Sequence, residues 1–200
     1  TLKILALTPG AGGMLCGSCL SDNTLVGGMQ SLGHDVSLVP LYTPITTDEE
    51  NLSIPPIFFG GMNVYLQQKF SIFRLLPRFL DRLLDHPRLI SLLTSLPANT
   101  NHDQLASLTL SMVRGEEGNQ RKEVQRLIDW LVREPLPDII HFSNLLVAGC
   151  ARSLKRKVTI PLVVTLQGDD VFLESLGEKH RAKIVDEMQN LVAEIDRFIV

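Results

Sequence analysis

Residues 2–13 read LKILALTPGAGG, an apolar run that passes directly into a glycine-rich turn. A run this short with almost no polar residue is typical of a strand buried on both faces of a parallel sheet. The turn contains Gly10, Gly12 and Gly13, and glycine lets a backbone turn sharply or approach a ligand closely. This stretch therefore predicts the first strand of an α/β sheet, followed by a turn that is able to meet a ligand.

The sequence after the turn predicts the rest of a strand–helix–strand unit. Leu25, Met29 and Leu32 recur at the spacing of one helix face, which predicts a helix over residues 18–32. Gly33 is expected to end that helix in the left-handed conformation. The apolar residues 36–41 then predict the second strand.

The second half of the chain repeats this alternation of strands and helices. Apolar runs predict strands over residues 138–142, 161–166 and 197–200, and helices are expected before, between and after the first two. The order predicts right-handed crossovers and a Rossmann-like, doubly wound parallel sheet. Between the two halves, residues 43–120 form an insertion that we expect to be largely helical, with residues 115–119 as a polar loop.

Composition limits the function classes. The chain has 200 residues and a formal net charge of -3, which suits one globular domain and disfavours a nucleic-acid-binding face. Three cysteines do not make a secreted disulfide framework, and neither a signal peptide nor a membrane-spanning apolar run is visible. We therefore predict a cytoplasmic protein. Both ends look cut, because the chain stops inside the apolar run of residues 197–200.

The glycine turn departs from two well-known phosphate-binding loops. A dinucleotide fingerprint that begins at Gly10 and Gly12 needs a third glycine where Leu15 stands, and no acid follows the second strand. A Walker A loop needs a lysine where Ser18 follows Gly17. A helix amino terminus after the turn is nevertheless suited to a phosphate, and a tight turn without a ligand is the alternative.

Four motifs resemble the family 4 retaining glycosyltransferases. These are the Pro9–Gly13 turn, the helix end Gly33-His34-Asp35-Val36, the strand Asp138-Ile139-Ile140-His141, and the strand and loop of residues 161–170. The last residues, Ile195 to Val200, are similar to a further strand of that family. One position departs from the family pattern, because Gln167 stands where the family usually has histidine. Glutamine can hydrogen-bond sugar hydroxyls but cannot serve as a general base.

The resemblance implies the amino-terminal, acceptor-side half of a GT-B fold, spanning residues 1–200. It implies transfer of a sugar from a nucleotide-diphosphate sugar to a sugar or lipid-linked acceptor, with retained configuration and no required metal or other cofactor. The nucleotide would be held mainly by a second, donor-binding domain that these residues do not contain, so this chain alone is expected to be inactive. Alternatives are a nucleotide-sugar epimerase, a dinucleotide-dependent oxidoreductase and a non-catalytic binding module.

Candidate site residues follow from these motifs and from the carboxyl ends of the expected strands, where open α/β sheets bind ligands. We predict a catalytic site at His141 and Asp169, with substrate binding by Gly12, Gly13, Gln167 and Asp170. The alternative for His141 is a purely structural role. The alternative for Asp169 and Asp170 is that they cap a helix and supply an acid to its first turn.

Two further features remain open. Arg78 and Arg82 share a helical face in the insertion, which suits either a helix that covers the sheet or peripheral contact with a membrane. Cys16 and Cys19 have the spacing of a redox pair at a helix start, but packing within the turn is the interpretation we favour. No second cysteine pair accompanies them, which disfavours a metal site.

Overall fold

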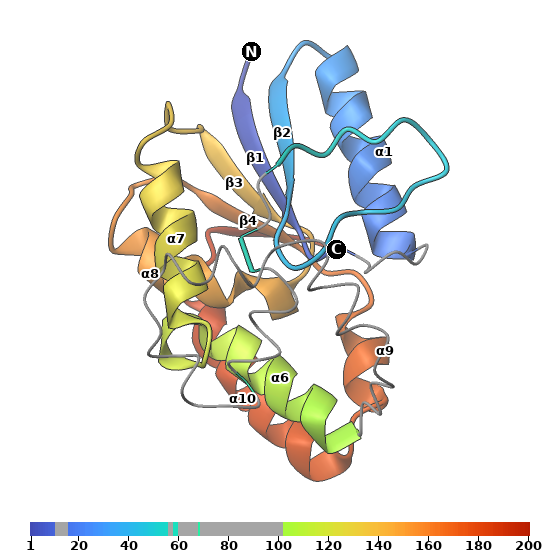
Figure 1. Ribbon diagram of the computed structural model, residues 1–200, viewed down its shortest axis with the longest axis vertical. Helices are drawn as coiled ribbons and strands as arrows, with labels where there is room; N and C mark the ends of the chain where they lie inside the picture. The colour runs from blue at the N-terminus through green and yellow to red at the C-terminus, as the bar shows by residue number, and fades with distance from the viewer. Residues whose placement is uncertain (11–15, 56–57, 60–67, 69–101) are drawn as a thin grey trace, which may run out of the picture.

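The computed structural model describes residues 1–10, 16–55, 58–59, 68 and 102–200. Within them the fold is α/β, with five parallel strands in one sheet (Figure 1). The strands are β1 (Lys3–Thr8), β2 (Asp35–Pro40), β3 (Ile139–Phe142), β4 (Leu162–Thr165) and β5 (Arg197–Ile199). Each coincides within one or two residues with an apolar run of the sequence, so the predicted α/β class and parallel sheet are confirmed.

The sheet has the order β2-β1-β3-β4-β5, so the direction of winding reverses between β1 and β3. The connection from β1 to β2 runs one way, and the connections from β2 to β5 run the other way. Right-handed crossovers then place α1 (Gly17–Ser31) on one face and the later helices on the opposite face. Figure 1 shows α1 on its own side of the sheet, away from α7 (Arg121–Leu131) and α8 (Ala151–Lys155).

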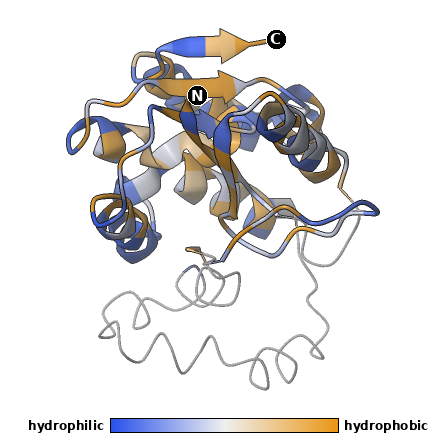
Figure 2. Cartoon of the chain, turned by 90° about the horizontal axis from the view of Figure 1, so that it is seen from above, coloured by the Kyte–Doolittle hydropathy of each residue, from blue (hydrophilic) through white to orange (hydrophobic). Residues whose placement is uncertain are grey.

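Two apolar clusters fill the two faces of the sheet. The smaller cluster joins Cys19 and Val26 of α1 to Ile4, Ala6 and Leu38. The larger one contains residues of the four strands β1 to β4, together with residues of α6 (His102–Arg114), α7, α8 and α10 (Glu178–Val192). In Figure 2 the strands in the middle of the molecule carry much of the hydrophobic colour. Alternate side chains of β1, β2 and β3 therefore serve opposite clusters.

The predicted apolar face of α1 is wrong. Leu25 is 44% exposed and Leu32 is 79% exposed, whereas Asp22 and Asn23 are buried beside Val26. Asn23 is satisfied there, because its Nδ2 donates to the Glu50 carbonyl oxygen and its Oδ1 accepts from the Leu52 amide. Hydrophobic periodicity places polar residues on the exposed face of a helix. In α1 two polar side chains are buried instead, because each of them forms hydrogen bonds there.

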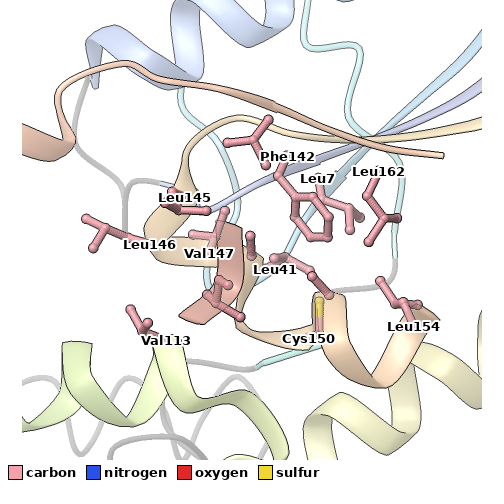
Figure 3. Packing of buried hydrophobic residues seen from close by; sticks show 14 of the residues in the cluster. Leu7, Leu41, Val113, Phe142, Leu145, Leu146, Val147, Cys150, Leu154 and Leu162 are labelled. Atoms are coloured by element: carbon pink, nitrogen blue, oxygen red, sulfur yellow. The ribbon is translucent and has the colours of Figure 1, made fainter. Parts of the chain in front are cut away.

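The segment after β3 forms the centre of the larger cluster. It begins with the 3-10 helix η2 (Leu145–Cys150), which leads into α8, and every residue of η2 is buried. Figure 3 shows side chains of η2 packing against Leu7, Phe142 and Leu162 from the strands. The short helix α9 (Asp169–Glu174) follows β4 and precedes α10. Short helical segments, η2 and α9, therefore follow the carboxyl ends of β3 and β4.

Two of the expected turns need glycine. Gly10 has φ +82°, and a Cβ built there would lie 1.7 Å from the Thr43 carbonyl oxygen, so the first turn closes directly on the loop after β2. Gly33 has φ +87° and follows α1, which confirms the predicted left-handed helix end. His34 accepts a hydrogen bond from the Leu2 amide at Nδ1, so it joins the helix end to the start of β1.

The insertion is partly described. Its last part forms α6 and then the 3-10 helix η1 (Gly115–Glu117), where a polar loop was predicted. Gly115 is buried, and a Cβ there would lie 2.1 Å from the Gly149 carbonyl oxygen, so close packing against η2 imposes the tight turn. The leucine-rich segments with Arg78 and Arg82 lie outside the described residues. Among the described helices, none is long and apolar enough to cross a membrane.

Candidate functional site at the strand switch point

The carboxyl ends of β1, β3 and β4 meet where the strand order reverses. Thr8 is the last residue of β1, Ser143 follows β3, and Gln167 lies two residues after β4. The Ser143 amide donates to the Leu7 carbonyl oxygen at 3.0 Å, which holds the end of β3 beside the end of β1. Open α/β sheets bind their ligands outside such an edge, so this is the place where we examine the side chains for a site.

A buried carboxylate links these strand ends. The Thr8 hydroxyl donates to Asp22 Oδ2 at 2.6 Å, and Gln167 Nε2 donates to Asp22 Oδ1 at 3.1 Å. The same nitrogen of Gln167 donates to the Ser143 carbonyl oxygen at 2.9 Å. We call Thr8, Asp22, Ser143 and Gln167 the Asp22 network. It ties α1 to three strand ends through one side chain of the helix.

Burial dominates the electrostatics of Asp22. The side chain is 5% exposed, and this desolvation raises the pKa of its carboxyl group above the usual value for aspartate. Hydrogen bonds from Thr8 and Gln167 act in the opposite direction. The Ser143 hydroxyl also approaches this carboxylate, but it lacks the geometry of a full hydrogen bond. The 2.6 Å contact with Thr8 is the length expected when a hydroxyl donates to an ionised carboxylate.

His141 lies on β3 and is 7% exposed. Its Nε2 forms a hydrogen bond of 2.8 Å with the hydroxyl of Thr165, the last residue of β4. Desolvation lowers the pKa of the imidazole below 6.5, so the ring is neutral at physiological pH. The predicted histidine is thus present next to the carboxyl edge, as a neutral group in a hydrogen bond with a hydroxyl.

Asp169 is buried, and its carboxylate contacts the amides that begin η2. Its Oδ2 accepts from Leu145 at 3.5 Å and its Oδ1 accepts from Leu146 at 3.4 Å. Asp169 is the first residue of α9, but its carboxylate serves η2 rather than its own helix. Burial raises the pKa of this carboxyl group above the usual value, and the two amides act against that rise. Asp170, the next residue, is exposed on α9.

The amino terminus of α1 stands at the same edge. Cys16 precedes the helix in an extended conformation, and its side chain makes no capping bond to the first amides. Instead Cys16 Sγ lies 3.1 Å from Ser18 Oγ. Cys19 is fully buried one turn into the helix, where its Sγ is 3.9 Å from the Thr8 hydroxyl. All three cysteines of the chain are free thiols.

The pKa values of these two thiols diverge. Burial acts to raise the pKa of Cys16, but hydrogen bonds from Ser18 and Cys19 outweigh it, and the pKa is lowered. Burial, followed by the charge of Cys16, raises the pKa of Cys19 to about 12. The pair therefore has one thiol that ionises readily and one that stays protonated.

The glycines predicted to bind substrate, Gly12 and Gly13, lie outside the described residues. Their flanks are described, since Gly10 turns away from β1 and Cys16 begins α1. Of the other predicted residues, Gln167 joins the Asp22 network and His141 lies beneath the same edge. Asp169 holds the adjoining turn, and Asp170 is exposed on α9. Within the described parts of the chain, no group of three or more acidic, histidine or cysteine side chains could hold a metal ion.

Sequence reasoning did not single out Thr8, Asp22 and Ser143. A usable signal exists for one of them, because Asp22 and Asn23 interrupt α1 on the side where Cys19 and Val26 are buried. Two adjacent polar residues on the buried side of a short helix mark a polar contact with the sheet.

No protein-family model matches this chain, and no curated protein is significantly similar to it. The resemblance to glycosyltransferases therefore depends on the short motifs of the sequence.

Proposed function

We propose that this chain is the acceptor-side domain of a GT-B glycosyltransferase that transfers a sugar from a nucleotide-diphosphate sugar with retention. The observation that carries the proposal is the Asp22 network, which places Gln167 at the carboxyl edge of the sheet beside the end of β1. Gln167 is also one of the residues that the sequence predicts to bind substrate. Sugar hydroxyls are recognised by neutral polar groups held in fixed positions, and this is what the edge offers.

Each element has a part in the proposed reaction. Gln167 hydrogen-bonds a hydroxyl of the sugar, and Gly12 and Gly13, which lie outside the described residues, are assigned to the donor diphosphate by the sequence motif. The uncapped amino terminus of α1 stabilises the charge that develops on the leaving diphosphate. The neutral ring of His141 acts through hydrogen bonds rather than charge. Retaining transfer then depends on positioning and electrostatic stabilisation more than on a strong base.

Asp169 has a different role in this proposal from the catalytic one suggested by the motif. Both of its carboxylate oxygens accept from amides of η2, so the side chain is engaged in holding that turn. We propose that it shapes the site by fixing the segment that follows Ser143. A dinucleotide oxidoreductase remains less favoured, because β2 ends at Pro40 and buried Leu41 rather than at an acid that could bind a ribose.

The test is turnover by the complete polypeptide that carries this chain. It is incubated with UDP-glucose, UDP-galactose, UDP-N-acetylglucosamine and GDP-mannose, with and without simple sugar acceptors, and nucleoside diphosphate release is measured. We expect acceptor-stimulated release from at least one donor, with a product of retained anomeric configuration. Gln167→Leu should lower kcat/KM at least tenfold, equivalent to about 1.4 kcal/mol.

The matched control is Gln189→Leu, which changes the same residue type at an exposed position of α10. That variant should keep the wild-type rate. Binding of NAD together with no consumption of any nucleotide sugar would contradict the proposed function and favour the oxidoreductase alternative.

A further inference from the structure

The amide of Gln167 can take only one orientation in the Asp22 network. Its Nε2 lies 3.1 Å from Asp22 Oδ1 and 2.9 Å from the Ser143 carbonyl oxygen. A carbonyl oxygen cannot donate a hydrogen bond, and an ionised carboxylate cannot either. Both hydrogens of the amide nitrogen are therefore turned toward these two acceptors. Reversal of the amide would set its oxygen against two other oxygens, so the usual ambiguity between amide nitrogen and oxygen does not arise here.

This orientation determines what Gln167 offers a ligand. Its two donors are engaged inside the protein, which leaves the oxygen Oε1 as the group of the amide that a ligand can use. The side chain is partly exposed, unlike the buried Asp22 and Ser143. A ligand that meets the exposed end of Gln167 therefore meets an acceptor and has to supply the donor.

We propose that Asp22 is a positioning residue that holds Gln167 with its oxygen toward the ligand, so that the ligand group bound there is a hydrogen-bond donor, a sugar hydroxyl. The identity of the ligand as a sugar rests on the proposed function, whereas the orientation of the amide does not. The assignment gives a reason for a carboxylate at a buried position of α1. A buried carboxylate without an ion-pair partner among the described residues destabilises a fold, and such groups are concentrated at functional sites.

A structural role for Asp22 would act through Thr8 instead. The Thr8 hydroxyl donates to the other carboxylate oxygen and joins α1 to β1. Thr8→Val removes that contact with little change of shape and leaves the contact between Asp22 and Gln167 in place. Asp22→Ala removes both contacts and puts a strong helix former in the middle of α1. Comparing these two variants separates the positioning role from the structural one.

The first measurement needs no ligand. Solvent exchange of the Gln167 side-chain NH2 group is followed by ¹⁵N NMR, with the resonances assigned by their loss in Gln167→Leu. We expect slow exchange in the wild type and at least tenfold faster exchange in Asp22→Ala. Asp22→Asn keeps one acceptor oxygen and should give an intermediate rate. Thr8→Val and the exposed control Asp186→Asn should keep slow exchange. If Asp22→Ala does not fold, the exchange rate in Asp22→Asn alone tests the proposal.

Equal exchange rates in the wild type and the Asp22 variants, whether fast or slow, would overturn the proposal. Faster exchange in Thr8→Val than in Asp22→Ala would also overturn it. The second measurement is kcat/KM with the nucleotide sugar that the protein turns over. Asp22→Ala and Gln167→Leu should each lower it at least tenfold, and the double variant should be within about threefold of the worse single variant, because both act at one point.

Analogues of that sugar in which fluorine replaces one hydroxyl at a time test whether a sugar hydroxyl donates a hydrogen bond to Gln167. At one position the wild type should lose at least tenfold in kcat/KM, and this loss should fall below threefold in Gln167→Leu. Equal losses in the two proteins at every position would overturn the assignment of a donor. Absence of all turnover, with the expected amide exchange, would contradict the proposed function while supporting the orientation set by Asp22.

Discussion

Replacing Asp169 by alanine tests whether its carboxylate holds the turn after β3. The change leaves the amides of Leu145 and Leu146 without their acceptor inside a buried segment. An unpaired buried amide costs about 1–3 kcal/mol, and the contacts of 3.5 and 3.4 Å are long, so we take about 1 kcal/mol for each. Removing a desolvated carboxylate offsets part of this loss, because burial raises the pKa of Asp169. The expected loss of unfolding free energy is therefore about 1–2 kcal/mol.

The assay is urea unfolding monitored by the fluorescence of Trp130, the one tryptophan of the chain. Trp130 is on α7, and its ring centroid lies 5.0 Å from that of Phe58. A loss of about 1–2 kcal/mol in a domain of this size corresponds to a fall in Tm of roughly 2–8 °C, which a thermal scan measures independently. The matched control is Asp170→Ala, which removes the same charge from the exposed neighbour and should change stability by less than about 0.5 kcal/mol.

Equal stability of the Asp169 variant and the wild type would refute the structural role. If transfer were lost at the same time, Asp169 would be a catalytic residue, as the sequence motif suggests. A fall in stability with transfer retained per folded molecule would support the role assigned here.

Three further predictions concern single residues near the same edge. Burial lowers the pKa of His141, so near and below pH 6.5 the unfolded chain binds more protons than the native one, and stability should fall as the pH drops through this range. Urea unfolding at a series of pH values measures this fall, and His141→Gln should remove the part that His141 contributes. Gly10→Ala should cost about 3 kcal/mol or prevent folding, because φ is +82° and backbone lies within contact, whereas Gly17→Ala should be nearly neutral by the same measurement. Iodoacetamide at neutral pH should modify Cys16 at least tenfold faster than Cys19 by mass spectrometry, and equal rates would show that the difference in pKa is not realised.

The sheet could be predicted from the sequence because buried parallel strands are short apolar runs. The strands that include Leu5 and Ile140 are buried on both faces, so almost every residue in them is apolar, whichever way it points. The strand that includes Val164 is buried on one face and half-buried on the other. Their carboxyl ends follow from the direction of the chain, and this placed His141 and Gln167 at the correct edge. The order of the strands could not be predicted, because it depends on which face each crossover covers.

The Asp22 network could not be predicted because its central residue breaks the usual pattern of burial. A periodicity argument places Leu25 inside and Asp22 outside, whereas the structure does the opposite. The reason is long-range: Thr8 and Gln167 supply donors from positions 14 and 145 residues away, respectively. The adjacent pair Asp22 and Asn23 is a local sign of a polar contact, but it does not identify partners that lie so far away in the chain.

We propose that ligand binds at the carboxyl edge of the sheet, where the strand order reverses. The most direct measurement is a map of backbone and side-chain amide shifts in ¹⁵N NMR spectra, recorded as the protein is titrated with a nucleotide-diphosphate sugar and with a simple sugar acceptor. We expect the largest shifts on Thr8, Ser143 and Gln167 and on the first turn of α1, and we expect these shifts to weaken in Gln167→Leu. Shifts confined to the opposite edge of the sheet, near Lys3 and Asp138, would contradict it.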